Sequence, residues 1–353
     1  MAAPSPCVLI TGGAGFIGSA LVRQWLADES SAIVNLDKLT YAGLRASLGE
    51  TLDNRRHALI EGDVADAALV RELLAAHRPQ AVLHLAAESH VDRSIAEPPQ
   101  FVRTNVLGTC TLLDEATRYW RTLSADDKQA FRFLLVSTDE VFGSAPSGER
   151  FSVDSPVAPN SPYAASKAGA EHLGHAFMHT YGLPVVTVNP TNNYGPRQFP
   201  EKLIPRMILA AARRQSLPLY GDGLHERDWL HVNDCCRAIR DVLRRGAAGA
   251  RYLVGGGNGR TNLQIVETIC DVVDQRLADG GGRRQCIRHV ADRPGHDRRY
   301  AVDASMTRKL GWTPQVDFQR GLEETVAWYL NNPRWVAEAE ESLVRNQDES
   351  ESR

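Results

Sequence analysis

A glycine-rich turn between an apolar run and a helical run constrains this chain more than any other feature. Residues 8–19 read VLITGGAGFIGS, with Gly12, Gly15 and Gly18 following a short run typical of a buried strand and opening an amphipathic helix. Glycines in this context let the backbone turn tightly and approach a ligand, and the helix N-terminus then faces negative charge. The pattern predicts a strand–helix unit that binds the pyrophosphate of a dinucleotide.

Strand-like and helical patterns alternate through the first half of the chain. The strand-like runs are residues 7–11, 31–37, 57–61, 81–86, 132–138 and 184–190. The helix-like segments include residues 15–27, 66–76, 100–119 and 162–181. This alternation predicts an α/β fold with a Rossmann-type, doubly wound parallel sheet that has helices on both faces.

The pattern changes after Asn189, where residues 189–205 are rich in Pro, Gly and Asn and are expected to form a loop. Shorter elements follow, with a strand expected at 217–220 and helices at 202–214, 234–245, 262–277 and 318–331. These shorter elements predict a smaller, mixed α/β C-terminal substrate domain.

The expected domain boundaries follow from this change of pattern. We expect a dinucleotide-binding domain over 1–190, to which a segment near 227–256 returns. The substrate domain is expected over 191–335. The tail at 340–353 is polar and charged, and we expect it to be disordered.

Composition limits the partners and the compartment. The 353-residue chain has a formal net charge of −3, which favours neither nucleic acid nor an anionic membrane as a partner. It has no apolar run approaching the ~20 residues of a membrane span and no pattern typical of a signal peptide. Its six cysteines include no CxxC motif. We therefore expect a cytoplasmic protein with no disulfides and no bound metal.

The ends of the second and third strand-like runs indicate which dinucleotide binds. Asp37 lies about 20 residues after Gly18, where a carboxylate binds the adenosine ribose and would repel the 2′-phosphate of NADP. We therefore expect NAD, although a cation such as Lys38 is also how NADP is held. Asp63 is placed to accept a hydrogen bond from the adenine amino group, the alternative being an ordinary loop aspartate.

Tyr163 and Lys167 stand four residues apart in a helical stretch, so they share one helix face. Such a pair is common on helix surfaces, but behind a dinucleotide-binding half it predicts a base for oxidising a secondary alcohol. A free tyrosine has a pKa near ~10, so we expect the ammonium and the positive nicotinamide ring to favour the phenolate. Thr138, at a strand end, is placed to hydrogen-bond the same substrate hydroxyl.

Two acids, Asp139 and Glu140, directly follow Thr138. Adjacent like charges at a strand end repel each other and gain nothing for the fold. Their presence therefore indicates chemistry that needs two carboxyl groups.

With these motifs the chain resembles the extended short-chain dehydrogenase/reductase family and, within it, the nucleotide-sugar 4,6-dehydratases. The stretches that carry the resemblance are TGGAGFIGS, LDKLTYAG, LAAESHVDRSI, STDEVFG, SPYAASKAG, NNYGPRQFPEKLIP, RDWLHVND and DRPGHDRRYAVD. The glycine and Tyr/Lys motifs are common to the wider family, whereas the Thr-Asp-Glu triplet and RPGHDRR are far more specific.

The resemblance implies an NAD-dependent lyase that dehydrates a sugar nucleotide, with dTDP-glucose as the expected substrate and UDP- or CDP-glucose as alternatives. Oxidation at C4 makes the C5 proton acidic. Asp139 is then the acid for the C6 hydroxyl, Glu140 the base at C5, and the hydride returns to C6. A 4-epimerase or sugar-acid decarboxylase would keep the glycines and Tyr/Lys without the acid pair. A non-catalytic dinucleotide sensor would typically lack the tyrosine or the lysine.

The resemblance also assigns site residues. The catalytic residues it implies are Thr138, Asp139, Glu140, Tyr163 and Lys167. The residues implied for NAD are Gly12, Gly15, Phe16, Ile17, Gly18, Asp37, Lys38, Thr40, Asp63, Val64, Ala86, Thr104, Tyr163, Lys167 and Asn193. The residues implied for the sugar nucleotide are Ser89, Thr138, Asn192, Lys202, Leu203, Pro218, Tyr220, Arg227, Asn262, Asp292, Arg293 and His296. A homodimer built on the helices of 99–120 and 162–181 is also expected.

Three departures from the family pattern stand near these motifs. Phe142 replaces a tyrosine, the sequence NPTNN at 189–193 replaces a Cys-Ser before the asparagine pair, and Arg197-Gln198 replaces an aromatic/His pair. We expect these changes to adjust the lip of the site and to leave the catalytic groups in place.

Overall fold

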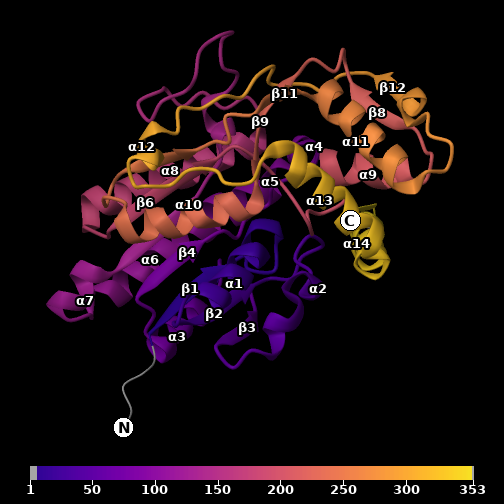
Figure 1. The fold of residues 1–353 in the computed structure, drawn as a ribbon. Helices are drawn as coiled ribbons and strands as arrows, with labels where there is room; N and C mark the ends of the chain where they lie inside the picture. The colour runs from indigo at the N-terminus through magenta and orange to yellow at the C-terminus, as the bar shows by residue number, and fades with distance from the viewer. Residues whose placement is uncertain (1–5, 352–353) are drawn as a thin grey trace.

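A seven-stranded parallel sheet forms the centre of the larger part of the molecule (Figure 1). The computed structural model describes residues 6–351. The strands lie in the order β10-β6-β5-β4-β1-β2-β3, and every neighbouring pair is parallel. Their bounds are β1 Cys7–Thr11, β2 Ala32–Asp37, β3 His57–Glu61, β4 Ala81–His84, β5 Arg132–Val136, β6 Val185–Pro190 and β10 Arg251–Val254. The predicted fold class is therefore confirmed.

Helices cover both faces of this sheet because side chains along a strand alternate between its faces. Val8 and Ile10 of β1 pack in the core that holds α1 and α10, whereas Leu9 packs in the opposite core with α3 and α6. The helices of this part are α1 Phe16–Asp28, α2 Arg45–Leu48, α3 Ala67–His77, α4 Val91–Ala96, α5 Pro98–Phe101, α6 Thr109–Arg121, α7 Ala125–Ala130, α8 Pro162–Tyr181 and α10 Val232–Arg245.

The helix expected at 100–119 is divided in the structure. α5 runs into a π-helical segment, Val102–Gly108, before α6 begins at Thr109. Within it, the buried Asn105 side chain bonds both the backbone N–H and the C=O of Glu88. A π segment widens the helix locally and is frequent at functional sites; here it carries Thr104 beside the pocket described below.

The smaller part is built from two short sheets and packed helices, the region around the labels β8, β12, α9 and α11 in Figure 1. β7 Asn192–Tyr194, β9 Glu226–His231 and β11 Gly259–Thr261 form one sheet, and β8 Leu217–Tyr220 pairs with β12 Ile287–Val290. The helices are α9 Leu203–Ala212, α11 Asn262–Leu277, α13 Phe318–Asn331 and α14 Pro333–Glu351, whereas α12 Ser305–Arg308 packs on β10 of the large sheet. One-turn helices occupy Gly49–Asp53, Asp139–Phe142 and Arg283–Cys286.

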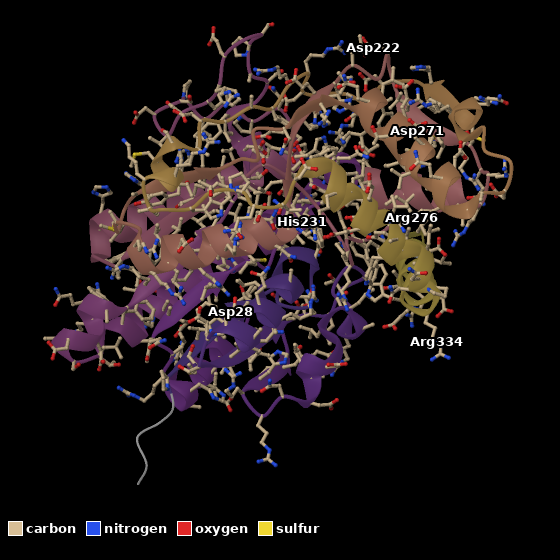
Figure 2. All side chains as sticks on the ribbon, viewed as in Figure 1. Asp28, Asp222, His231, Asp271, Arg276 and Arg334 are labelled. Carbon is tan, nitrogen blue, oxygen red and sulfur yellow. The ribbon has the colours of Figure 1, made fainter. Side chains whose placement is uncertain are left out.

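Within the segment near 227–256, α10 and β10 return to the large sheet while β9 stays in the smaller one. β10 pairs with β6 at the sheet edge. α10 packs on α1, where Arg240 pairs with Asp28 at 2.5 Å, the residue labelled at the end of α1 in Figure 2.

The prediction of a disordered tail at 340–353 is wrong up to Glu351, where α14 ends. Trp335, Val336 and Ala339 are buried on one face of this helix. One turn further on, the Ser342 hydroxyl donates to the Tyr41 carbonyl at 2.8 Å. The polar composition reflects the solvent side and hides this helical stripe. The last two positions, 352–353, lie outside the described residues.

All six cysteines lie in the described part and have free thiols, and Cys235 and Cys236 are buried in α10. Among the helices of residues 6–351, none combines the length and apolarity that crossing a bilayer needs.

Candidate active site

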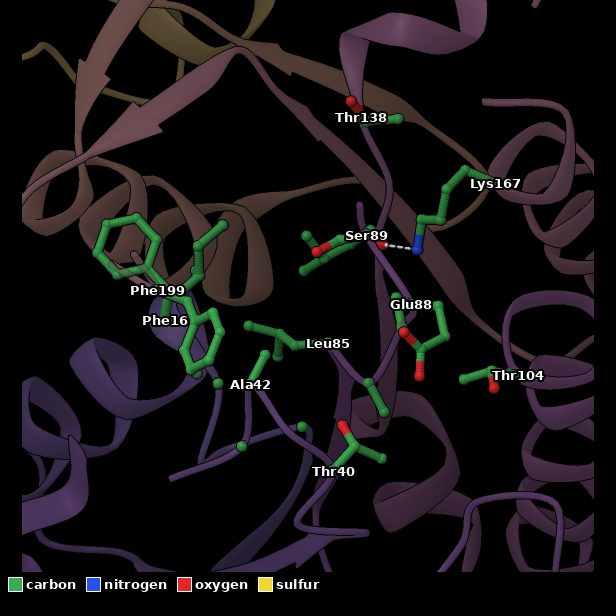
Figure 3. A pocket seen from close by; sticks show the side chains of 18 of the residues that line it. Phe16, Thr40, Ala42, Leu85, Glu88, Ser89, Thr104, Thr138, Lys167 and Phe199 are labelled. Atoms are coloured by element: carbon green, nitrogen blue, oxygen red, sulfur yellow. Dashed lines mark hydrogen bonds between the residues drawn. The ribbon is translucent and has the colours of Figure 1, made fainter. Parts of the chain in front are cut away.

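A pocket lies at the carboxyl ends of the parallel strands, where an open α/β sheet binds its ligands (Figure 3). Its lining includes all fifteen residues predicted for NAD, from Gly12 to Asn193. The acid pair lines it too, as do four residues predicted for the sugar nucleotide: Ser89, Thr138, Asn192 and Lys202. In the close-up, Thr138 and Lys167 lie at one end and Thr40 at the other.

The glycine turn is shaped by close approach of backbone to backbone. Gly12 has φ +72°, and a Cβ there would lie 2.5 Å from the Ala86 nitrogen. A Cβ at Gly18 would lie 2.0 Å from the Gly12 oxygen, so glycine is required at both positions. A Cβ at Gly15 would meet the Gly12 oxygen at an ordinary 3.4 Å. Gly15 caps α1 and lines the pocket, so its bare backbone and the helix N-terminus suit a pyrophosphate.

Asp37 is held rigidly beside this turn. Its carboxylate accepts hydrogen bonds of 2.8 Å from the backbone N–H of Ala14 and of Leu39. Lys38 turns away to Asp63 instead, with 2.7 Å between Nζ and Oδ2. Although burial opposes it, this hydrogen bond lowers the pKa of Asp63. The cation that could have favoured NADP is therefore engaged by a second carboxylate.

Tyr163 and Lys167 lie in the first turns of α8, which starts at the N-cap Ser161 and Pro162. Both side chains are buried, and Lys167 Nζ donates to the Val136 carbonyl at 2.8 Å, the dashed line in Figure 3. Burial lowers the pKa of Lys167 to about 8.

In the protein without its cofactor, Lys167 by itself does not favour the Tyr163 phenolate. Burial first, and then the charge of Glu140, raise the pKa of Tyr163, whereas a hydrogen bond with Thr138 lowers it. The ammonium contacts the carbonyl at the end of β5, so it does not offset the cost of burying a phenolate.

The acid pair follows β5 in a one-turn helix that Thr138 caps, its hydroxyl accepting from the Glu140 N–H at 3.3 Å. Burial, then the charges of Glu140 and Asp228, raise the pKa of Asp139 well above its usual range. Burial also raises the pKa of Glu140, but Arg293, Arg227 and Lys202 oppose this. The charges acting on Asp139 are thus mainly negative, and those acting on Glu140 are mainly positive. This asymmetry suits one carboxyl for donating a proton and the other for accepting one.

The remaining residues predicted for the sugar nucleotide do not line this pocket: Leu203, Pro218, Tyr220, Arg227, Asn262, Asp292, Arg293 and His296. Two of them, Arg293 and Arg227, nevertheless lie close enough to the acid pair for their charges to lower the pKa of Glu140. Arg227 is buried on β9, stacks on Tyr300 at 4.3 Å and donates to the Asp297 carbonyl at 2.8 Å. Arg227 is therefore a buried side chain and not a member of an exposed ion pair.

Several buried polar atoms around the site have no hydrogen-bond partner within the described residues. They include the side-chain oxygens of Asn192, Asn193 and Asn262, Oδ2 of Asp139 and Nε of Arg293. Because buried polar groups are nearly always satisfied, atoms of this kind gathered at one site fit a polar ligand. The donors and acceptors suit a nucleotide with its diphosphate.

Some residues that line the pocket were not predicted from the sequence, and Phe142 lies farther from the site than the sequence indicated. Glu88, Phe199 and Glu201 line the pocket, and only their place within the quoted motifs could have indicated it. Gln198 also lines it and holds Asn193 by donating to its carbonyl at 2.8 Å. Phe142, in contrast, packs against Phe151 in a separate apolar cluster outside the lining.

Comparison with known proteins places this geometry among nucleotide-sugar enzymes. The family model described as GDP-mannose 4,6 dehydratase matches residues 9–325. The dTDP-glucose 4,6-dehydratase 1 of Escherichia coli K12 is 49% identical over 93% of this chain and 94% of its own. The dTDP-glucose 4,6-dehydratase of Xanthomonas campestris pv. campestris B100 is 52% identical with the same coverages. The crystal structure of the Streptomyces venezuelae dTDP-glucose 4,6-dehydratase, with NAD and TYD bound, has a TM-score of 0.85 and 45% identity. It covers 93% of this chain and 98% of its own.

Proposed function

This chain belongs to the GDP-mannose 4,6 dehydratase family, within the extended short-chain dehydrogenase/reductases. We propose that it converts dTDP-glucose to dTDP-4-keto-6-deoxyglucose. The observation that carries this function is the presence of Tyr163, Asp139 and Glu140 in one pocket with the glycine turn. An epimerase needs the tyrosine and the turn, and has no use for an acid pair of unlike environments.

The residues of the chain divide the proton transfers among them. NAD, when bound, supplies the hydride acceptor at C4 and returns the hydride to C6, so it ends as it began. Tyr163 accepts the proton of the C4 hydroxyl, which Thr138 hydrogen-bonds. Glu140 takes the C5 proton, and Asp139 donates a proton to the C6 hydroxyl, which leaves as water. The buried surroundings of these groups keep bulk water from the reacting carbons.

Turnover of dTDP-glucose by the purified protein tests this function. The product should lack one water by mass spectrometry, whereas an epimerase would give a product of unchanged mass. UDP-glucose and CDP-glucose are offered in parallel, because the same catalytic groups would serve them. Faster turnover of either would assign the enzyme to that nucleotide instead.

We expect Asp37→Ala to weaken NAD binding and to relieve the exclusion of NADP, because the variant loses the carboxylate placed to bind the ribose and repel a 2′-phosphate. Dissociation constants for both dinucleotides, from fluorescence titration, measure this. Asp66→Ala is the matched control: it removes a carboxylate that likewise accepts from two backbone N–H groups, at the start of α3 and outside the pocket. Equal affinity of the unchanged protein for NAD and NADP would contradict this role of Asp37.

We also propose a homodimer formed through the face that carries α8 and the π-helical segment. Val102 and Leu107 are 52% and 55% exposed there, and α8 packs directly against that segment. Light scattering at micromolar concentration should give a dimer, and the double variant Val102→Glu/Leu107→Glu should give a monomer. Leu52→Glu, at an exposed apolar residue elsewhere, should leave the dimer intact. A monomeric unchanged protein would rule the interface out.

A further inference from the structure

The loop Asp292–His296 follows β12 and precedes Arg299, which pairs with Glu226 at the start of β9. It places Arg293 near the acid pair. Arg293 Nη1 donates to Asp92 Oδ1 at 3.2 Å, and its charge acts on the pKa of Glu140. Its buried Nε has no hydrogen-bond partner within the described residues. The loop contains no helix or strand, so its position depends on side-chain contacts.

Those contacts come chiefly from a clamp of three residues, His225, Asp292 and His296. His225 Nε2 lies 3.2 Å from one oxygen of Asp292, and His296 Nδ1 lies 2.7 Å from the other. The two imidazole rings stack with centroids 3.7 Å apart and planes 13° apart. Burial lowers the pKa of both histidines, that of His296 to about 4, so at neutral pH each ring is neutral. The His296 Nδ1–H donates to Asp292, and His225 Nε2 lies beside the other oxygen of the same carboxylate.

His225 anchors this clamp to the smaller sheet. Its side chain is 4% exposed, it immediately precedes β9, and its carbonyl accepts from the Asn262 N–H at 2.9 Å. Arg298, beyond the loop, forms a two-bond ion pair with Asp222 at 2.7 and 2.8 Å; Asp222 is labelled in Figure 2. The loop is thus fixed on both sides, by His225 at its start and by Asp222 after its end.

The same three residues could be taken for a metal site, since their ligand atoms lie within 4.8 Å of one another. The stacking argues against that. Each nitrogen lone pair lies in the plane of its own ring, so two parallel rings cannot direct their lone pairs at one ion unless one ring rotates out of the stack.

We propose, on the basis of the function proposed above, that His225 is a positioning residue that holds Asp292 and thereby sets Arg293 to bind the diphosphate of the substrate. Arginine suits a diphosphate because its planar group donates in pairs. A contact between Arg293 and the diphosphate stabilises the bound substrate and the transition state equally. Loss of that contact by itself therefore raises KM and does not change kcat.

His225→Ala tests this in the full-length enzyme, with His225→Gln as the conservative variant, since a glutamine amide can still donate to Asp292. We expect the alanine variant to raise both the KM for dTDP-glucose and the Kd for dTDP roughly tenfold. Because the Arg293 charge also lowers the pKa of Glu140, any fall in kcat should be rescued by the glutamine variant together with the affinity. The glutamine variant should restore most of the affinity. His289→Ala is the matched control, because this histidine lies on adjacent β12 and bonds the Gly221 carbonyl rather than the loop.

Unchanged KM and Kd in His225→Ala would overturn the role of His225. So would a fall in kcat and in melting temperature that the glutamine variant does not rescue, which would mark a purely structural residue. If His225→Ala does not fold, Asp292→Asn should show the same KM effect, and an unchanged KM there overturns the proposal.

Calorimetry with ZnCl₂ tests the alternative of a metal site. Tight zinc binding that is lost in both His225 variants would make the cluster a metal site. A wild-type protein inactive on dTDP-glucose would instead overturn the proposed function, and this inference with it.

Discussion

Glu140→Gln should lower turnover of dTDP-glucose by roughly 10²–10⁴-fold, the usual worth of a positioned base, and should spare the first oxidation. Glutamine keeps the shape and hydrogen bonding of Glu140 but cannot take the C5 proton. Tyr163 and Thr138 are unchanged, so the C4 hydroxyl is still oxidised. The bound cofactor should therefore still be reduced when dTDP-glucose is added, seen as NADH absorbance, while exchange of the C5 proton with deuterated solvent should stop.

Asp139→Asn separates the acid from the base. It should lower turnover over the same range and still permit C5 exchange, because deprotonation precedes loss of water in a stepwise elimination. Tyr163→Phe should abolish both the NADH signal and the exchange. Glu149→Gln, at an exposed residue of the following loop, is the control that should change neither. Exchange at the wild-type rate in Glu140→Gln would show that another group is the base.

Gly15→Ala and Gly18→Ala should separate NAD binding from folding. The methyl added by Gly15→Ala would meet the protein only at ordinary contact distance, 3.4 Å from the Gly12 oxygen, but would stand on the backbone that lines the pocket. We expect a near-normal melting temperature and NAD binding weakened roughly 10²-fold or more, the worth of one or two charge-assisted hydrogen bonds.

At Gly18 a methyl would lie 2.0 Å from the Gly12 oxygen, so the backbone of the turn must move. Gly18→Ala should therefore lower the melting temperature as well as NAD affinity, at a cost of about 1–3 kcal/mol in unfolding free energy. Thermal unfolding and calorimetric titration of NAD measure the two effects. Wild-type NAD affinity in Gly15→Ala would show that this turn is not the pyrophosphate site.

Local patterns in the sequence were sufficient for six of the seven strands of the sheet, all but β10, and for the position of the site. The spacing of apolar residues differs between strands and helices, so the runs at 7–11, 57–61 and 162–181 predicted β1, β3 and α8 to the residue. Since strands of a parallel sheet end on one edge, the Gly15, Asp37 and Thr138 regions were bound to meet. The chemistry of the acid pair came from residue types and resemblance.

What the sequence could not determine depends on distances between residues far apart in the chain. The burial of α14 depends on Tyr41 and Ser47, some 290 residues earlier, so composition alone mistook its later turns, from residue 340 on, for disorder. The raised pKa of Tyr163 reflects burial and Glu140, whereas the sequence showed only Lys167 one helical turn away. Likewise, His225 and His296 meet over Asp292 only because β9 and the loop after β12 pack together. Residue types and their spacing along the chain therefore show which groups are present and on which elements they lie. The burial and the neighbouring charges that set how each group behaves depend on how distant segments of the chain pack together.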